Sequence, residues 1–128
     1  MLVIDTSALI AVQFGEPEAG SIKAILVPRT MIGAPTLLEY QLVVGGRFGD
    51  AGLAEARALV ERMDLAIMNF DEEMALLAAN AFMRFGKGQH PARLNYGDCM
   101  AYAVAKAVDA PLLYKGGDFA KTDIRSAL

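Results

Sequence analysis

The sequence predicts a three-layer α/β/α fold, in which a short, mainly parallel sheet lies between two layers of helices. Short apolar segments alternate along the chain with longer segments of helical periodicity, and this pattern is typical of parallel sheets covered on both faces. The 128 residues contain no repeat, low-complexity tract or linker, and 55% of them are hydrophobic. We therefore expect a single domain over residues 1–128 with a well-developed core.

Four apolar runs are the predicted strands. The first is the clearest, because Leu2–Asp5 consists of three apolar residues followed by an acid. The second is the weakest candidate, and Gly116–Gly117 closes the fourth. The predicted strands are residues 2–5, 29–34, 64–70 and 110–115.

The segments between these runs carry apolar residues at intervals of three and four, which predicts helices. The first is expected to be only a short helix or a single turn. The predicted helices are residues 6–14, 16–27, 35–48, 50–63, 72–86 and 96–108. Residues 87–95 are polar and are predicted to form a loop.

Residues with known preferences for helix ends mark several boundaries. Pro35 suits a first turn, and Gly45–Gly46 is expected to weaken or end the helix that Pro35 opens. Asp50 and Asp71 precede amphipathic segments as candidate N-caps. Gly86 follows the last turn of the segment that Asp71 precedes.

Charge and cysteine content restrict the function. A net charge of −3 argues against a module that binds nucleic acid through a basic surface, but it allows an enzyme that meets phosphates through a bound metal. The single cysteine, Cys99, excludes an intrachain disulfide. No apolar run is long enough to span a membrane, and the apolar start contains Asp5 and lacks a basic region. We expect a cytoplasmic protein with no secretion signal and no membrane partner.

Four acids fall at predicted strand ends, or at a helix start that can share the same edge of the sheet. Asp5 ends the first strand, and Glu39 lies in the first turns of the helix after the second strand. Asp98 begins the helix before the last strand, and Asp118 follows that strand. In open α/β sheets, ligand-binding sites form beyond the carboxyl ends of the strands, which is the edge where these acids are expected. Four carboxylates in one pocket repel one another, and a divalent cation with oxygen ligands, Mg²⁺ or Mn²⁺, removes that conflict.

Each of these acids also has a purely structural interpretation. Asp5 and Asp98 are suited to stabilising the start of a helix, Glu39 to facing solvent, and Asp118 to a turn in a glycine-rich loop. Taken one at a time, the residues leave both interpretations open. Only their joint placement at one edge favours a metal site.

Four segments of the chain, in order, resemble the PIN domain family: "VIDTSAL", "APTLLEY", "LNYGDCMAYAVA" and "PLLYKGGDFAKTDI". More closely, they resemble the VapC-type ribonuclease toxins of toxin–antitoxin modules. This resemblance implies a PIN-like domain and an endoribonuclease that depends on Mg²⁺, with Mn²⁺ as the alternative. It also implies cleavage of structured cellular RNA, a homodimer, and neutralisation by a cognate antitoxin protein.

The resemblance carries onto individual residues. It implies metal-binding and catalytic roles for Asp5, Glu39 and Asp98, with Asp118 as the fourth acid of the same set. Many members carry Asp or Asn beside this fourth acid, where this chain has Gly117, so the exact fourth ligand stays open. Thr6 and Ser7 match small hydroxyl residues that commonly support the first aspartate in such proteins.

Other functions fit the sequence less well. A phosphatase of the haloacid-dehalogenase type requires a second acid two residues after its first aspartate, where this chain has Ser7. A receiver-like signalling domain places its acceptor Asp after the third strand and a Lys after the fifth, and this chain does not offer that pattern. The alternative that stays open is a non-catalytic PIN-like module that binds RNA or a protein.

Some further residues are candidates for catalysis or for contacts with RNA. His90 is the only histidine, which excludes a mechanism based on two histidines, and Cys99 suits packing better than nucleophilic attack. Basic residues that are candidates for contacts with RNA phosphates are Arg84, Lys87, Arg93, Lys115 and Lys121.

Overall fold

Four short strands form one parallel sheet with the spatial order β3-β2-β1-β4. The computed structural model describes residues 1–26 and 29–128. The strands are β1 (Val3–Ile4), β2 (Met31–Gly33), β3 (Ala66–Met68) and β4 (Leu112–Leu113). The helices are α1 (Thr6–Gln13), α2 (Ala19–Ile25), α3 (Ala34–Arg62), α4 (Glu72–Phe85) and α5 (Tyr96–Ala107), followed by the 3₁₀ helix η1 (Phe119–Lys121). All four predicted strands are confirmed, and each is shorter than the apolar run that predicts it.

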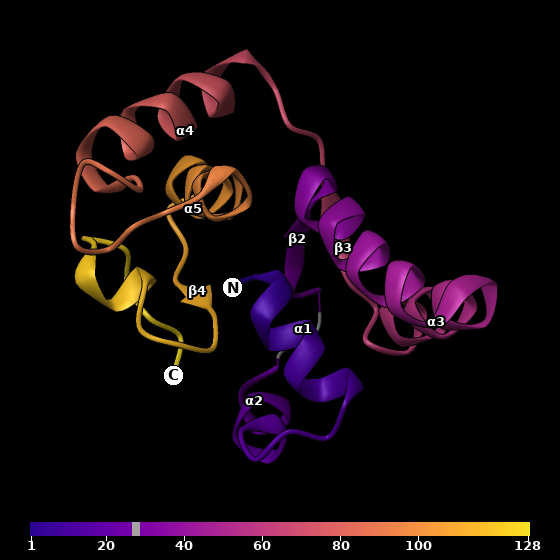
Figure 1. Cartoon of the computed structure of the whole chain (residues 1–128). Coiled ribbons are helices and arrows are strands. Elements are labelled where there is room, and N and C mark those ends of the chain that lie inside the picture. The colour runs from indigo at the N-terminus through magenta and orange to yellow at the C-terminus, as the bar shows by residue number, and fades with distance from the viewer. Residues whose placement is uncertain (27–28) are drawn as a thin grey trace.

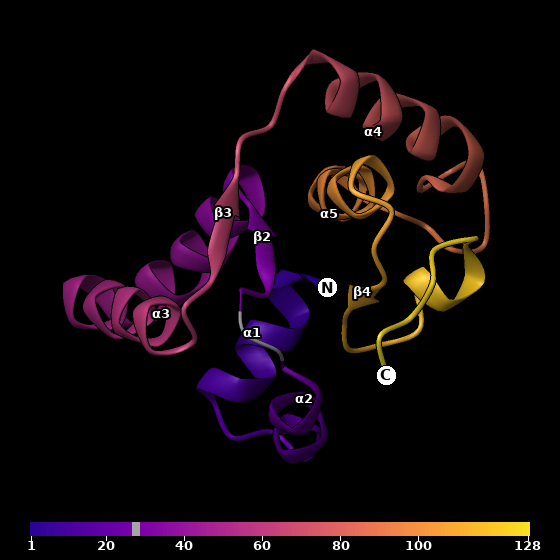
Figure 2. The ribbon, with the colours of Figure 1, turned by 180° about the vertical axis from the view of Figure 1, so that it is seen from behind.

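Helices cover both faces of the sheet, which confirms the predicted α/β class (Figures 1 and 2). Helices α4 and α5 lie on one face, and α1, α2 and α3 lie on the other. Successive strand residues point to opposite layers: Val3 packs in the cluster with α4 and α5, and Ile4 in the cluster with α1 and α3. Because both faces are buried, the strands are apolar throughout rather than alternating with polar residues.

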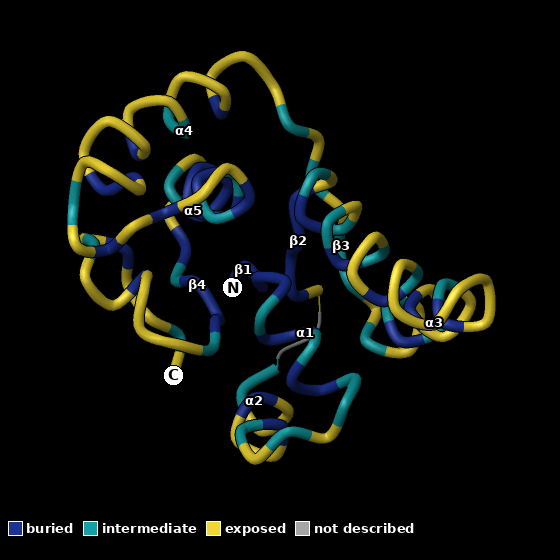
Figure 3. Tube along the Cα trace, viewed as in Figure 1, coloured by how far each residue is buried: buried dark blue, intermediate teal, exposed yellow. Residues whose placement is uncertain are grey.

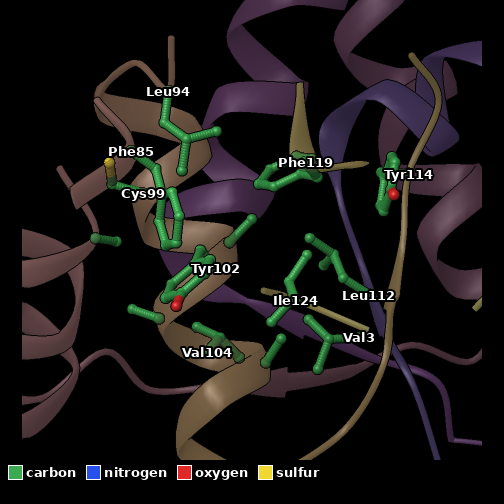
Figure 4. Close-up of a cluster of buried hydrophobic side chains, with 14 of the residues drawn as sticks. Val3, Phe85, Leu94, Cys99, Tyr102, Val104, Leu112, Tyr114, Phe119 and Ile124 are labelled. Atoms are coloured by element: carbon green, nitrogen blue, oxygen red, sulfur yellow. The ribbon is translucent and has the colours of Figure 1, made fainter. Parts of the chain in front are cut away.

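Most residues of helix α5 are buried, and Figure 3 shows much of it in dark blue. Small residues at Ala101, Ala103 and Ala105 are completely buried or nearly so, and allow the helix to pack closely on the sheet. Figure 4 shows the cluster around it, in which the rings of Phe85 and Tyr102 have centroids 6.0 Å apart. The outer face of α4, in contrast, is exposed along most of its length.

Along α3 the structure agrees with the two predicted helices and differs only in the glycine that separates them. Gly45–Gly46 does not end the first of the two helices predicted here, which runs on to the residue before Gly49. The helical geometry is broken instead at Gly49, whose φ of 70° lies in the left-handed region that glycine adopts without strain. Two helices therefore meet at Gly49 within α3, and Asp50 follows this break at the start of the predicted helix of residues 50–63. Although α3 has 29 residues, no helix in the described part of the chain is long and apolar enough to cross a membrane.

Other helix ends agree with the prediction more closely. Asp71 caps α4 as expected, because its side chain accepts a hydrogen bond from the Met74 amide at 2.9 Å, and Gly86 ends that helix. The predicted helix over residues 16–27 is reduced to α2, and its last predicted residue, Val27, lies outside the described residues.

Candidate metal centre

Asp5 lies at the carboxyl end of the central strand β1 and is 4% exposed. Its backbone amide donates to the Leu113 carbonyl at 2.9 Å and so continues the pairing with β4. Its side chain caps α1: Oδ2 accepts from the Ser7 amide at 3.0 Å and from the Ser7 hydroxyl at 2.6 Å. The other oxygen, Oδ1, is buried, and no group among the described residues donates a hydrogen bond to it. Asp5 is thus a helix cap through one oxygen and has a second oxygen left for a ligand.

Ser7 connects this carboxylate to a distant part of the chain. Its hydroxyl accepts a hydrogen bond from the Lys115 amide at 2.9 Å, just beyond β4. The Lys115 ammonium in turn pairs with Glu16 at 3.1 Å and with Glu18 at 3.5 Å, in the segment between α1 and α2. The orientation of Asp5 therefore depends on the loop that leads to Asp118.

Glu39 reaches the same edge from the second turn of α3 and is half-buried. Its Oε1 accepts a hydrogen bond from the Thr6 hydroxyl. The resemblance assigned both Thr6 and Ser7 to the first aspartate, but the structure divides them. Ser7 donates hydrogen bonds to the Asp5 carboxylate, whereas Thr6 donates one to the Glu39 carboxylate.

Asp98 lies in the first turn of α5 and is half-buried. It does not precede the helix as its cap, because that position belongs to Asn95. Burial raises the pKa of the Asp98 carboxyl, the Asn95 amide opposes this change, and the negative charges of Asp118 and Glu39 add to it.

Asp118 is exposed, at the start of η1. Residues 114–117 separate it from β4, so it does not follow the strand directly as predicted. Its negative charge nevertheless contributes to the raised pKa of Asp98.

The four acids thus form one electrostatically coupled group, which we call the carboxylate cluster (Asp5, Glu39, Asp98 and Asp118). Burial raises the pKa of Asp5 to about 6, against the opposing effect of its hydrogen bonds from Ser7, and the charges of Asp98 and Glu39 contribute to the rise. A divalent cation relieves both the burial of these charges and their mutual repulsion. The buried, unpaired Oδ1 of Asp5 and the all-oxygen donor set fit Mg²⁺ or Mn²⁺.

His90 and Cys99 have structural roles. The Nδ1 atom of His90 accepts from the Ala92 amide at 3.0 Å, and the imidazole packs edge-on against Phe85. Cys99 is buried, and burial raises the pKa of its thiol to about 11, so it is no nucleophile near neutral pH.

The predicted basic residues divide into two groups. Lys115 is paired as described above, and Arg84 lies 3.6 Å from Asp123. Lys87, Arg93 and Lys121 are exposed.

Sequence reasoning missed a groove that opens beside Glu39 between α3 and α5. Its volume is about 1020 Å³, and apart from Glu39 it is mainly apolar. The apolar side chains that line it include Pro35, Leu38, Leu42, Phe70, Tyr96 and Met100. Apolar residues such as Leu42 and Tyr96, which the structure leaves exposed, are present in the sequence far apart from one another. Only the fold brings them to one surface.

Comparisons with known proteins agree with this architecture. The family model described as PIN domain matches residues 2–125. A ribonuclease VapC of Mycolicibacterium smegmatis is 40% identical over 125 residues, which cover 96% of this chain and 97% of that protein. Ribonuclease VapC30 of Mycobacterium tuberculosis is 39% identical over 125 residues, which cover 96% of this chain and 95% of that protein.

Solved structures share the fold. Mycobacterium tuberculosis VapC20, described as a sarcin-ricin loop cleaving toxin, has a TM-score of 0.77 at 19% identity and covers 97% of this chain and 96% of its own. VapBC2 of Rickettsia felis, solved with a DNA fragment from its promoter, has a TM-score of 0.76 at 13% identity, over 98% of this chain and 95% of its own. Given the match to the family model over nearly the whole chain and the identity to these relatives, the chain belongs to the PIN domain family and, within it, to the VapC ribonucleases.

Proposed function

We propose that this protein is a metal-dependent endoribonuclease toxin that hydrolyses phosphodiester bonds of cellular RNA. The carboxylate cluster is the observation that supports this function most strongly, because four acids from separate parts of the chain influence one another's ionisation near one sheet edge. Mg²⁺ is the proposed metal, with Mn²⁺ as the alternative.

Asp5, Glu39 and Asp98 are the proposed metal ligands. Ser7 donates two hydrogen bonds to Oδ2 of Asp5, and the unpaired Oδ1 is the oxygen proposed to bind the ion. Among the described residues, no three acidic, histidine or cysteine side chains stand close enough together to ligate one ion directly. We therefore propose that some of the ligation passes through water, since Mg²⁺ usually keeps several waters and binds only one or two carboxylates.

When bound, the cation supplies an activated water and stabilises negative charge on the phosphate. The exposed carboxylate of Asp118 is proposed to orient the attacking water or to hold a second ion. The exposed ammonium and guanidinium groups of Lys87, Arg93 and Lys121 are proposed to contact phosphates of the RNA.

We further propose a cognate antitoxin and a homodimer as partners, in the cytoplasm. A solved structure with the same fold, at a TM-score of 0.73, is a toxin–antitoxin complex from Klebsiella pneumoniae. In the present chain, the apolar groove beside Glu39 is a large surface suited to burial against another protein.

Cleavage of RNA by purified protein freed of metal with EDTA tests the proposal. The parent protein is expected to cleave only after Mg²⁺ or Mn²⁺ is added, and Asp5→Asn and Glu39→Gln are expected to abolish cleavage while circular dichroism shows an intact fold. Asp64→Asn is the matched control, because Asp64 precedes β3 and so lies at the opposite edge of the sheet, and Asn tolerates its φ of 51°.

Full cleavage by a folded Asp5→Asn variant would remove the carboxylate cluster from the mechanism. Binding of RNA by the parent protein without cleavage at any metal concentration would favour the non-catalytic module instead.

A further inference from the structure

Two residues outside the set of proposed ligands hold the Glu39 carboxylate from opposite sides. The first is Thr6, which directly follows Asp5 and is 8% exposed. Its hydroxyl donates to Oε1 of Glu39 and also lies 3.4 Å from the Thr36 carbonyl. The start of α1 thereby fixes a side chain that belongs to α3.

The second residue is Gly97, which lies in the first turn of α5 next to Asp98. A Cβ atom on Gly97 would collide with Oε2 of Glu39, and it would lie 2.8 Å from Cδ and 3.2 Å from Oε1. The carboxylate therefore rests directly against the α-carbon of Gly97, in space that any other residue would fill.

Building on the metal-dependent function proposed above, we propose that Thr6 and Gly97 are positioning residues for Glu39. The Thr6 hydroxyl fixes the rotation of the carboxylate through Oε1, and Gly97 leaves the space in which Oε2 lies. Glu39 is a side chain with three rotatable bonds, so without these two contacts its carboxylate would sample several positions relative to Asp5 and Asp98. Both residues act on the metal through Glu39, and neither is a ligand.

A purely structural role for the two residues predicts different behaviour. The Glu39 carboxylate is the far end of a flexible side chain, so it can move away from an added methyl group without disturbing the backbone. Alanine also favours a helix more than glycine does. Gly97→Ala is therefore expected to melt at the same temperature as the parent or higher, while it binds metal more weakly. If Gly97 served only the packing of α5, the melting temperature would fall and metal binding would follow it.

The test measures the Mn²⁺ dissociation constant of metal-free protein by isothermal titration calorimetry, together with melting temperatures without metal. Thr6→Val removes the hydroxyl at nearly constant shape, and Thr6→Ser retains it. Thr36→Val is a matched control, since the Thr36 hydroxyl is buried and has no hydrogen-bond partner among the described residues. Gly20→Ala is the control for helix propensity, because a Cβ at this position in α2 meets no atom within 4 Å.

We expect Thr6→Val and Gly97→Ala to weaken Mn²⁺ binding by about 10- to 100-fold, as is usual when a residue that orients a metal ligand is changed. Thr6→Ser and both controls are expected to bind Mn²⁺ as the parent does. If the parent binds Mn²⁺ and both Thr6→Val and Gly97→Ala bind it equally well, the positioning role is wrong and the proposed function still stands. If the parent does not bind Mn²⁺ at all, the proposed function fails and the positioning role fails with it. Should Thr6→Val not fold, Gly97→Ala with its Gly20→Ala control decides the question.

Discussion

Asn95 and Asp98 each accept a hydrogen bond from the backbone amide of the other, at 2.9 Å to Asn95 Oδ1 and 3.1 Å to Asp98 Oδ2. This reciprocal capping box begins α5 and orients a member of the carboxylate cluster. The two interpretations that the sequence leaves open for Asp98, helix stabilisation and ligation, are therefore compatible, because the capping bond uses Oδ2 only.

Comparison of Asp98→Asn with Asp98→Ala separates these two roles. Asparagine still offers an oxygen to the Asn95 amide, whereas alanine does not, so Asp98→Ala is expected to unfold more easily than Asp98→Asn by about 0.5–1.5 kcal/mol. Both variants are expected to lose most of the stabilisation by Mn²⁺, which for the parent is about 2.7 kcal/mol at a concentration of about 100 times Kd. Urea unfolding with and without Mn²⁺ measures both effects. Equal stability of the two variants would show that the capping bond contributes nothing.

The raised pKa of Asp5 predicts how stability without metal depends on pH. Because the pKa is about 6 in the folded state and about 3.8 in the unfolded state, the native protein holds a proton that the unfolded chain has lost between these values. The resulting contribution to stability is complete below about pH 4 and is lost as the pH rises through about 6; it amounts to roughly 3 kcal/mol. Asp5→Asn is expected to lack this loss, so its stability relative to the parent rises between pH 4 and pH 7. Urea unfolding in EDTA across this range provides the measurement, and parallel curves for the two proteins would contradict the raised pKa.

Ser7→Ala removes the hydroxyl that links Asp5 to Lys115. The Asp5 carboxylate then loses a hydrogen bond that lowers its pKa, so its pKa is expected to rise further above about 6. Because the metal competes with the proton, the pH at which Mn²⁺ binding is half-maximal is expected to rise as well. Calorimetric titrations at several pH values test this, with Ser21→Ala on the exposed surface of α2 as control. An unchanged midpoint would mean that the Ser7 hydroxyl does not act on Asp5.

Tyr102→Phe tests the attachment of the C-terminal segment. The Tyr102 hydroxyl donates to Asp123 at 2.5 Å, and the Lys106 ammonium lies 3.1 Å from the same carboxylate. Loss of the hydroxyl is expected to lower the free energy of unfolding by about 1.5–3 kcal/mol, because it removes a hydrogen bond to a charged group. Mn²⁺ affinity is expected to stay unchanged, since Asp123 is no member of the carboxylate cluster. Denaturant unfolding and calorimetry check the two expectations, and a weaker Mn²⁺ affinity would mean that this contact supports the cluster.

The sequence was enough to predict the order of strands and helices along the chain. It was also enough to predict that Asp5 and Glu39 lie near one edge of the sheet, and both predictions have the same basis. Short apolar runs in an α/β pattern imply parallel strands, and the carboxyl ends of parallel strands meet at one edge, so Asp5 and Glu39 are placed by their position after a strand.

Features that depend on how helices rotate and pack were not accessible in this way. The bond from Thr6 to Glu39 requires α1 and α3 to face one another in one particular register, which no local pattern encodes. Gly45, Gly46 and Gly49 all permit a helix to end, and only packing selects Gly49 as the bend. The space at Gly97 is likewise defined by a side chain that lies far away in the sequence.

The hydrogen bond between the Ser7 hydroxyl and the Lys115 amide joins residues separated by 108 positions. Asp5 leaves the ribosome long before Lys115, so its carboxylate cannot be fully oriented until Lys115 has also emerged and β4 has paired with β1. A nascent chain that has not yet reached Lys115 therefore carries an Asp5 carboxylate that is not fully oriented. The fold thus makes the orientation of one member of the carboxylate cluster depend on a segment that is synthesised much later than that member.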